Sequence, residues 1–204
     1  MDREKELIAR ELMREREKEW TTTRLVRIFT GTWNVAGKAF EEENHMNGGI
    51  SELLDFLHLE RKGIEEEGGG RGGYDIVAIA LQEIVALNTM NVVMDNSKSE
   101  EREVFWAESI QKCLDLSGEA YSLLCSNTLV GIGLFVFIKE SLSMFAYDVR
   151  SCVAASGLLN VMGNKGGVAI SFRLFDSNLC FVSAHLGRSF FTHSMCISIR
   201  LLLF

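Results

Sequence analysis

The sequence YDIVAIALQE, residues 74 to 83, contains the strongest structural signal in this chain. Apart from Asp75, the residues from Tyr74 to Leu81 are apolar, and several of them are β-branched. An apolar run of this length is typical of a central strand that is buried on both faces of its sheet. We therefore predict a strand from Tyr74 to Leu81 that ends at Gln82 and Glu83.

Hydrophobic periodicity predicts the other helices and strands. Ile50, Leu53, Leu54 and Leu57 have the i, i+3, i+4, i+7 spacing of a helix that packs on one face. A second helix is expected from Glu103 to Leu114. Strands are expected at residues 25 to 30, Tyr121 to Leu124, Ile132 to Ile138, Val168 to Leu174 and Leu179 to Ser183. Helices early in the chain and strands late favour an α/β sandwich.

Three segments are expected to lie outside this folded unit, which covers residues 24–186. Residues 1–23 are mostly charged and are expected to form a solvated helix or a linker. Residues 65–73 combine three glutamates with a glycine-rich run, which predicts a surface loop. Residues 187–204 form an apolar tail, unlike the charged segment 1–23 and the glycine-rich loop at 65–73.

The composition is that of a globular protein of the cytoplasm. The chain is 47% hydrophobic, and its longest apolar run, Leu129 to Ile138, is too short for the ~20 residues of a membrane span. The first twenty residues lack the apolar core of a secretory signal. Five cysteines without a C-x-x-C motif are expected to be reduced. A net charge of −7 without a basic cluster disfavours nucleic acid as a partner.

Three polar residues follow predicted buried strands and are candidates for chemistry: Asn34, Glu83 and His185. Strand ends fix the direction of a side chain, so they suit converging metal and phosphate ligands. Each residue also has a structural interpretation, as a turn former, a helix-start residue or a hydrogen-bonded core histidine. Glu83 is the least easily explained in this way, because a carboxylate after a buried strand needs a compensating cation or donor.

A glycine-rich loop from Ser156 to Gly167 adds a second candidate region. It contains four glycines and Lys165, so it could bring backbone N–H groups and one mobile cation against a phosphate. A long connection between two strands is an equally good interpretation of the same composition.

Four motifs in this order and approximate spacing resemble those of the inositol polyphosphate 5-phosphatases. They are TWNVAGK at 32–38, QEIVALN at 82–88, MGNKGGV at 162–168 and AHL at 184–186. The resemblance implies the four-layer α/β sandwich of pancreatic deoxyribonuclease, present here as an incomplete, N-terminal half. It also implies a Mg²⁺-dependent hydrolase that acts on phosphoinositides or soluble inositol polyphosphates, with peripheral contact to membranes left open.

The resemblance also implies roles for individual residues. Glu83 resembles the principal Mg²⁺ ligand, Asn34 its metal and phosphate partner, and His185 the histidine that contacts the scissile phosphate. Asn164, Lys165 and Gly166 resemble the loop that faces the substrate. Ala36 and Ala184 depart from the commoner Asn and Ser of these motifs.

The family motifs that follow the histidine are absent from this sequence. They include the carboxylate that orients the attacking water, so we expect the chain as written to be inactive and poorly folded alone. Two other interpretations stay open at this point: a non-catalytic fragment that binds phosphoinositides, and a nuclease of the same fold. The Asn164-Lys165-Gly166 loop and the acidic net charge disfavour the nuclease.

Overall fold

A computed structural model of the chain describes residues 2–16, 19, 21–36, 53, 55–57, 73–84, 96–155, 165–185 and 197–203. Its helices and strands follow one another as α1 (Asp2–Glu15), β1 (Ile28–Asn34), β2 (Ile76–Gln82), α3 (Asn96–Asp115), β3 (Tyr121–Leu129), β4 (Ile132–Lys139), α4 (Glu140–Ser143), β5 (Ala146–Ala155), β6 (Gly166–Leu174), β7 (Ser177–His185) and β8 (Ile197–Leu203).

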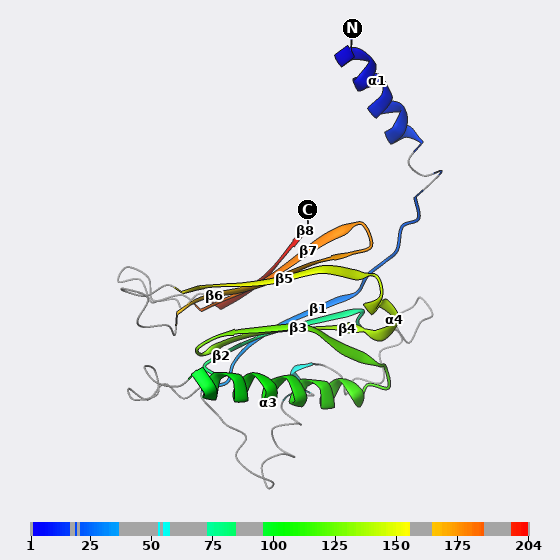
Figure 1. The fold of residues 1–204 in the computed structure, drawn as a ribbon. Helices are drawn as coiled ribbons and strands as arrows, with labels where there is room; N and C mark the ends of the chain where they lie inside the picture. Colours follow the sequence, from blue (N-terminus) through cyan, green and yellow to red (C-terminus); the bar gives the residue numbers. More distant parts are fainter. Residues whose placement is uncertain are drawn as a thin grey trace.

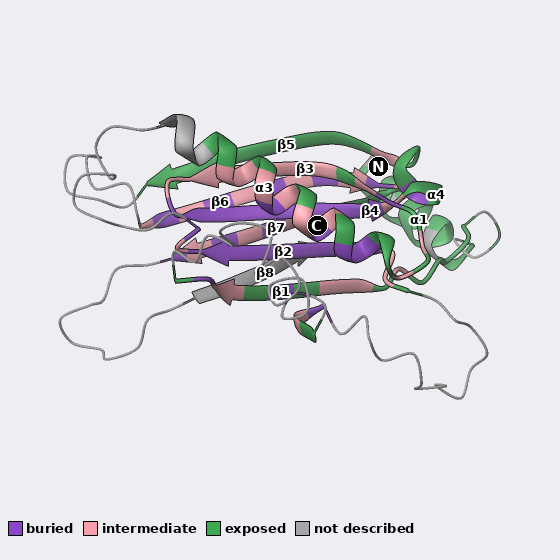
Figure 2. Ribbon diagram, turned by 90° about the horizontal axis from the view of Figure 1, so that it is seen from below, coloured by how far each residue is buried: buried purple, intermediate pink, exposed green. Residues whose placement is uncertain are grey.

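The first sheet has the strand order β1-β2-β4-β3, with β1 parallel to β2 and the other neighbours antiparallel. The predicted central strand is confirmed, because every residue of β2 is buried (Figure 2). β1 begins at Ile28 and not at the predicted residue 25, because the pairing of β1 with β2 starts at Ile28 and Ile76. β3 continues to Leu129 past a bulge at Leu123/Cys125, a continuation that the polar residues Ser126 to Thr128 concealed in the sequence.

The second sheet has the strand order β5-β6-β7-β8, and all its neighbours are antiparallel. β6 and β7 include the two strands predicted for this region. The sequence pattern did not predict β5, because its residues are mostly exposed and mix polar with apolar types. β8 was also missed, and it places part of the apolar tail beside β7.

The two sheets stack face to face, and α3 covers the far side of the first sheet (Figure 1). Alternate residues of β2 therefore enter different cores. Val77, Ile79 and Leu81 pack toward α3, together with Trp106 and Ile110 of that helix. The intersheet core is formed by apolar residues of β2, β4, β6 and β7, among them Ala78, Ala80, Val136, Ile170 and Phe181.

The described layers agree with the predicted α/β sandwich: a helix, a sheet and a second sheet. No helix covers the outer face of the second sheet within the described residues, so the fourth layer is not seen there. α3 begins at Asn96, earlier than the predicted Glu103, because its first residues are polar and carry no periodic signal. No described helix is both long and apolar enough to cross a bilayer.

The remaining predicted segments are only partly described. Leu53 and Leu57 are buried, and the Leu57 N–H donates to the Leu53 carbonyl at 2.9 Å, as the predicted helix requires. Ile50, Leu54 and the loop at 65–72 lie outside the described residues. α1 lies within the charged segment 1–23 and projects away from the two sheets (Figure 1).

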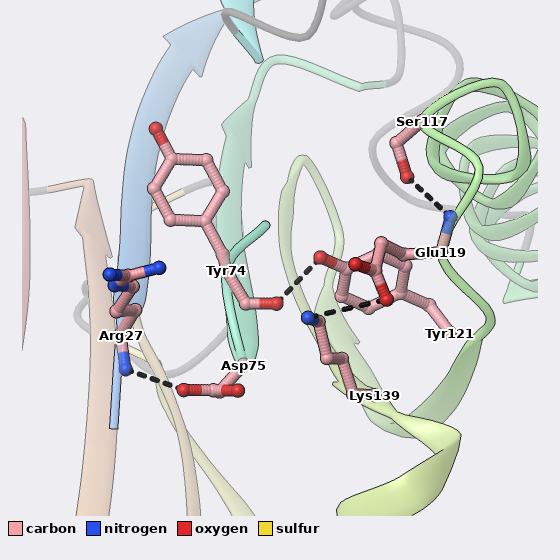
Figure 3. A network of polar contacts seen from close by, with 7 residues as sticks. All are labelled: Arg27, Tyr74, Asp75, Ser117, Glu119, Tyr121 and Lys139. Carbon is pink, nitrogen blue, oxygen red and sulfur yellow. Dashed lines mark hydrogen bonds and ion pairs between the residues drawn. The ribbon is translucent and has the colours of Figure 1, made fainter. Parts of the chain in front are cut away.

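The end of the first sheet where β1 and β2 begin is closed by paired polar groups (Figure 3). The Asp75 carboxylate accepts from the Arg27 N–H at 2.8 Å, and the Tyr121 hydroxyl donates to the Tyr74 carbonyl at 2.6 Å. Lys139 forms an ion pair with Glu119 at 3.3 Å. Burial of the Tyr121 hydroxyl, reinforced by the charges of Glu119 and Asp75, raises its pKa to about 12. We call this region the closed end.

Candidate functional site

The candidate residues come together at the end of the sandwich opposite the closed end. β1 ends at Asn34, β2 is followed directly by Glu83, and these two parallel strands end level with each other. β7 ends at His185, which pairs with Gly166 at the start of β6, immediately after Lys165. We call this region the site end. Asn164 lies outside the described residues.

The first sheet contributes a hydrogen-bonded pair, Asn34 and Glu83. The Asn34 amide donates from Nδ2 to Glu83 Oε1 at 3.1 Å. The other atom of the same amide, Oδ1, accepts from the Ala36 N–H at 2.9 Å, which is the turn that Asn commonly forms after a strand. In this arrangement Asn34 holds the Glu83 carboxylate in place, and its own oxygen is already bonded to the backbone.

The backbone at Glu83 has an unusual conformation. Its φ angle is 55°, in the left-handed region that costs a non-glycine residue about 1–3 kcal/mol. Backbone hydrogen bonds to neighbouring segments hold it there: the Val35 N–H, just after β1, donates to the Gln82 carbonyl at 2.9 Å, and the Ile84 N–H donates to the carbonyl of Gly131, in the turn between β3 and β4, at 3.2 Å. The chain thus turns sharply at the end of β2, and Glu83 emerges half-buried. Strained residues of this kind concentrate at functional sites.

The second sheet contributes a basic pair, Lys165 and His185. Lys165 Nζ lies 2.7 Å from His185 Nε2. Burial of the ring lowers the pKa of His185, the positive charge of Lys165 lowers it further, and the negative charge of Glu83 partly opposes both. The imidazole is therefore neutral at neutral pH. Because a lysine ammonium group can only donate, we assign Nε2 as the acceptor in this contact and place the ring proton on Nδ1.

Gly166 occupies a position that only glycine can take. Its φ angle is 153°, and a Cβ atom there would collide with the Ala154 carbonyl oxygen and approach Leu129 Cδ2 to 2.7 Å. The absence of a side chain lets β6 start directly against β5, and this start places Lys165 beside His185. A direct contact between Gly166 and substrate stays a prediction.

The two pairs provide complementary functions at one end of the molecule. Glu83 offers a half-buried carboxylate to a cation, and Lys165 and His185 offer donors to an anion. Within the described ranges, no three His, Cys, Asp or Glu residues are grouped as in an all-protein metal site. Mg²⁺ does not require such a group, because one or two carboxylates with waters and substrate phosphate suffice. The donor set therefore fits a cation shared with a phosphate.

Two buried polar residues behind these pairs were not selected from the sequence. Gln82 directly precedes Glu83, and Ser183 lies two residues before His185; both are fully buried. The Gln82 amide donates from Nε2 to Thr32 Oγ1 at 2.9 Å. Gln82 was visible in the sequence as the polar end of an apolar strand. The environment of Ser183 depends on the stacking of the sheets, which no local pattern shows.

The comparison with protein families matches residues 31–190 to Endonuclease/Exonuclease/phosphatase family 2. The chain is 34% identical to Synaptojanin-2 of Rattus norvegicus over 176 residues, and 36% identical to human Synaptojanin-1 over 172 residues. These alignments cover 85% and 83% of this chain and 11% of each relative. Inositol-1,4,5-trisphosphate 5-phosphatase 1 of Schizosaccharomyces pombe is 32% identical, over 87% of this chain and 15% of that protein. The chain thus spans roughly a tenth of the synaptojanins.

The structure is also similar to solved structures. The inositol polyphosphate 5-phosphatase domain of SPsynaptojanin, in complex with inositol (1,4)-bisphosphate and calcium ion, matches with a TM-score of 0.66 at 30% identity. The match covers 92% of this chain and 48% of that domain. Cimex nitrophorin matches with a TM-score of 0.54 at 15% identity, a likeness of fold alone. The motifs, the stacked sheets and the match over residues 31–190 together show that this chain belongs to the endonuclease/exonuclease/phosphatase family, and they confirm its resemblance to the inositol polyphosphate 5-phosphatases.

Proposed function

We propose that the protein containing this chain removes the 5-phosphate from phosphoinositides or soluble inositol polyphosphates by Mg²⁺-dependent hydrolysis. The observation that carries the proposal is the meeting of the Asn34–Glu83 pair with the Lys165–His185 pair at one end of the sandwich. The similar crystal structure holds a divalent cation and inositol (1,4)-bisphosphate. That compound is what remains when inositol 1,4,5-trisphosphate loses its 5-phosphate, which supports this substrate class.

Glu83 is proposed as the metal ligand of the chain. Its carboxylate is fixed from two directions, by the strained backbone turn and by the hydrogen bond from Asn34. A carboxylate held in this way is pre-organised for a cation, and its outer partner matters nearly as much as the ligand itself. When bound, Mg²⁺ would polarise the phosphoryl oxygens and lower the charge repulsion met by an attacking water.

The basic pair is proposed to bind the phosphate that leaves. Lys165 brings a compact, mobile charge, and neutral His185 directs its Nε2 at that charge. A phosphate oxygen between the two side chains would accept a hydrogen bond from the Lys165 ammonium in place of His185 Nε2. Once Nε2 is protonated from solvent, the His185 ring could donate a second hydrogen bond to the phosphate. Asn164 and Gly166 are proposed to contribute to substrate contact from the same loop.

The rest of the reaction is proposed to use residues outside this chain. The chain covers 48% of the matched 5-phosphatase domain, and the carboxylate expected to orient water was not found in its sequence. For the longer protein we propose a cytoplasmic location, with peripheral contact to membranes where its lipid substrates lie.

The alternative within the same family is a nuclease. The local charge at the site end does not distinguish the two, because both substrates are phosphate esters. The overall charge of −7 favours a compact inositol phosphate over a polyanionic duplex, since nucleic acid binding needs an extended basic surface.

The test compares substrates and metals on a protein that contains this chain and the remainder of the domain. Phosphate release is measured from vesicles with a 5-phosphorylated phosphoinositide, from soluble inositol 1,4,5-trisphosphate, and, for a nuclease, as cleavage of duplex DNA. We expect Mg²⁺-dependent release from at least one inositol substrate, abolished by EDTA, and no DNA cleavage. DNA cleavage without inositol turnover would establish the nuclease instead. Binding to the vesicles without turnover of any substrate would favour the non-catalytic interpretation.

A further inference from the structure

Two polar atoms behind the site end are buried and have no hydrogen-bond partner among the described residues. They are Oε1 of Gln82 and Oγ of Ser183, and both side chains have an exposed fraction of 0%. Turning the Gln82 amide by 180° would exchange its oxygen and nitrogen, but one of them would still lack a partner. Buried polar atoms in native proteins nearly always have a partner, either a protein group or an ordered water.

The two atoms belong to strands that face each other across the intersheet core. Ala78 and Ala80 of β2 pack in this core, so Gln82, at the next alternate position, points the same way. On β7, Leu179 and Phe181 pack in the same core, and Ser183 follows in the same alternation. β2 lies against β7, and both strands run toward the site end.

The described residues also lack a polar connection between the two halves of the site. The bond from Asn34 to Glu83 stays within the first sheet, and the contact of Lys165 with His185 stays within the second. No described hydrogen bond runs from one pair to the other. The distance between the carboxylate and the imidazole therefore depends on how β2 and β7 are held together just behind them.

We propose that Gln82 and Ser183 together bind one buried water molecule between the sheets, and that this water holds the end of β2 against the end of β7. The site is polar on both sides, as a buried water requires, and the small side chains of Ala78 and Ala80 allow a close approach of the strands. Gln82 and Ser183 are then positioning residues. They set the separation of Glu83 from His185 without touching substrate.

A high-resolution crystal structure of the unmodified protein tests the water directly. We expect one ordered water within hydrogen-bond distance of both Gln82 Oε1 and Ser183 Oγ. Separate waters on the two side chains, a direct bond between them, or a protein group bonded to either of these atoms would overturn the proposal. This test does not depend on the reaction, so it stays informative if the proposed function is wrong.

A double-mutant cycle tests whether the two residues act through one water. Gln82→Met and Ser183→Ala remove the polar groups with little change of volume. If they share a water, the combined change in the unfolding constant should differ from the product of the single changes by about threefold or more. Ser171→Ala is the matched control, because Ser171 lies on the outer face of the second sheet and should combine with Gln82→Met independently. If the change in the unfolding constant of the double variant equals the product of the two single changes within about twofold, Gln82 and Ser183 act independently and the proposal is overturned.

The catalytic consequence rests on the proposed function and is measured separately. In the active protein, each of the two variants should lower kcat with little change in KM, because substrate contacts stay in place while the two halves of the site shift. The double variant should lower kcat no further than the more damaging single variant. Equal losses for the control Ser171→Ala would contradict a positioning role.

Discussion

The closed end and the site end of the sandwich satisfy their polar groups differently. At the closed end, Asp75, Tyr121 and Lys139 each have a partner in the protein, and the strand starts are joined through backbone and side-chain bonds. At the site end, Glu83 has a strained backbone, and a buried ring lies beside a lysine. In the first sheet, the closed end is thus well bonded, and the conformational strain lies at the site end.

The difference separates stability from chemistry. Bonds at the closed end fix where β2 starts and where β4 ends, and packing in the intersheet core holds the same two strands in place along their length. The site end can then tolerate strain and unpaired groups, because the rest of the molecule determines its conformation. If this is right, substitutions at the site end should change activity more than stability, and substitutions at the closed end should do the reverse.

The largest expected effect is that of Glu83→Gln on activity. The amide keeps the shape of the side chain and can still accept from Asn34, but it removes the negative charge offered to the cation. In the complete domain we expect kcat/KM to fall by at least about a hundredfold, since loss of outer partners alone reaches that scale. Steady-state phosphate release at saturating Mg²⁺ measures it.

The matched control for that experiment is Glu108→Gln, an exposed glutamate in the C-terminal half of α3, the half that leads to the closed end. It should leave kcat/KM unchanged. Thermal unfolding of both variants should stay close to that of the parent protein. Full turnover of Glu83→Gln at saturating Mg²⁺ would remove Glu83 from the metal site, and a large loss of stability would break the contrast between the ends.

A smaller effect is expected for Lys165→Ala, and it should appear in binding. A flexible point charge next to a phosphate holds the substrate without fixing a reaction geometry, so KM should rise by about tenfold while kcat falls less. Lys112→Ala on α3 is the control, because that lysine is exposed and distant from the site end. A fall in kcat with unchanged KM would assign Lys165 to the transition state.

Tyr121→Phe tests the closed end, where stability rather than activity should change. The substitution removes the donor that satisfies the part-buried Tyr74 carbonyl, and leaving a buried acceptor without its donor costs up to about 1–3 kcal/mol. Denaturant unfolding measures the loss, and kcat/KM should be unchanged. Tyr147→Phe is the control, because that hydroxyl also donates to a backbone carbonyl but at an exposed position. Equal losses for the two variants would show that burial at the closed end is unimportant.

The sequence predicted the buried strands of this fold better than the exposed ones. β2, β4, β6 and β7 have continuous or alternating apolar patterns that follow directly from burial. β5 and β8 lie at the edges of their sheet, and most of β5 is exposed, so its composition carries no such pattern. Edge strands owe their pairing to the neighbour, which a single sequence does not show.

The residues of the candidate site also divide into those that the sequence could indicate and those that depend on strand pairing or sheet stacking. Asn34, Glu83 and His185 could be selected because each follows a predictable strand, and the structure brings them to one end. The contact of Lys165 with His185 joins residues that are 20 positions apart, and it exists only because β6 pairs with β7. The buried state of Ser183 is likewise a product of sheet stacking. Their roles in catalysis stay predictions.

The smallest expected effect is a pH dependence that comes from His185. Burial and Lys165 lower its pKa below the ordinary value of ~6.5 that it regains on unfolding. Below that pH the unfolded chain binds more protons than the folded one. The stability contributed by the neutral ring is therefore complete above about pH 6.5 and is lost as the pH falls through the lower, folded pKa.

NMR titration of the His185 ring measures that pKa directly, and the metal-free protein is used so that no cation contributes. Lys165→Met should raise the pKa by removing the nearby positive charge, although burial, the larger cause, should keep it below the ordinary value. Lys112→Met should leave it unchanged. A His185 pKa at or above the ordinary value in the parent protein, or one that Lys165→Met does not move, would show that the basic pair does not form. The proposal that a substrate phosphate binds between Lys165 and His185 would then lose its physical basis.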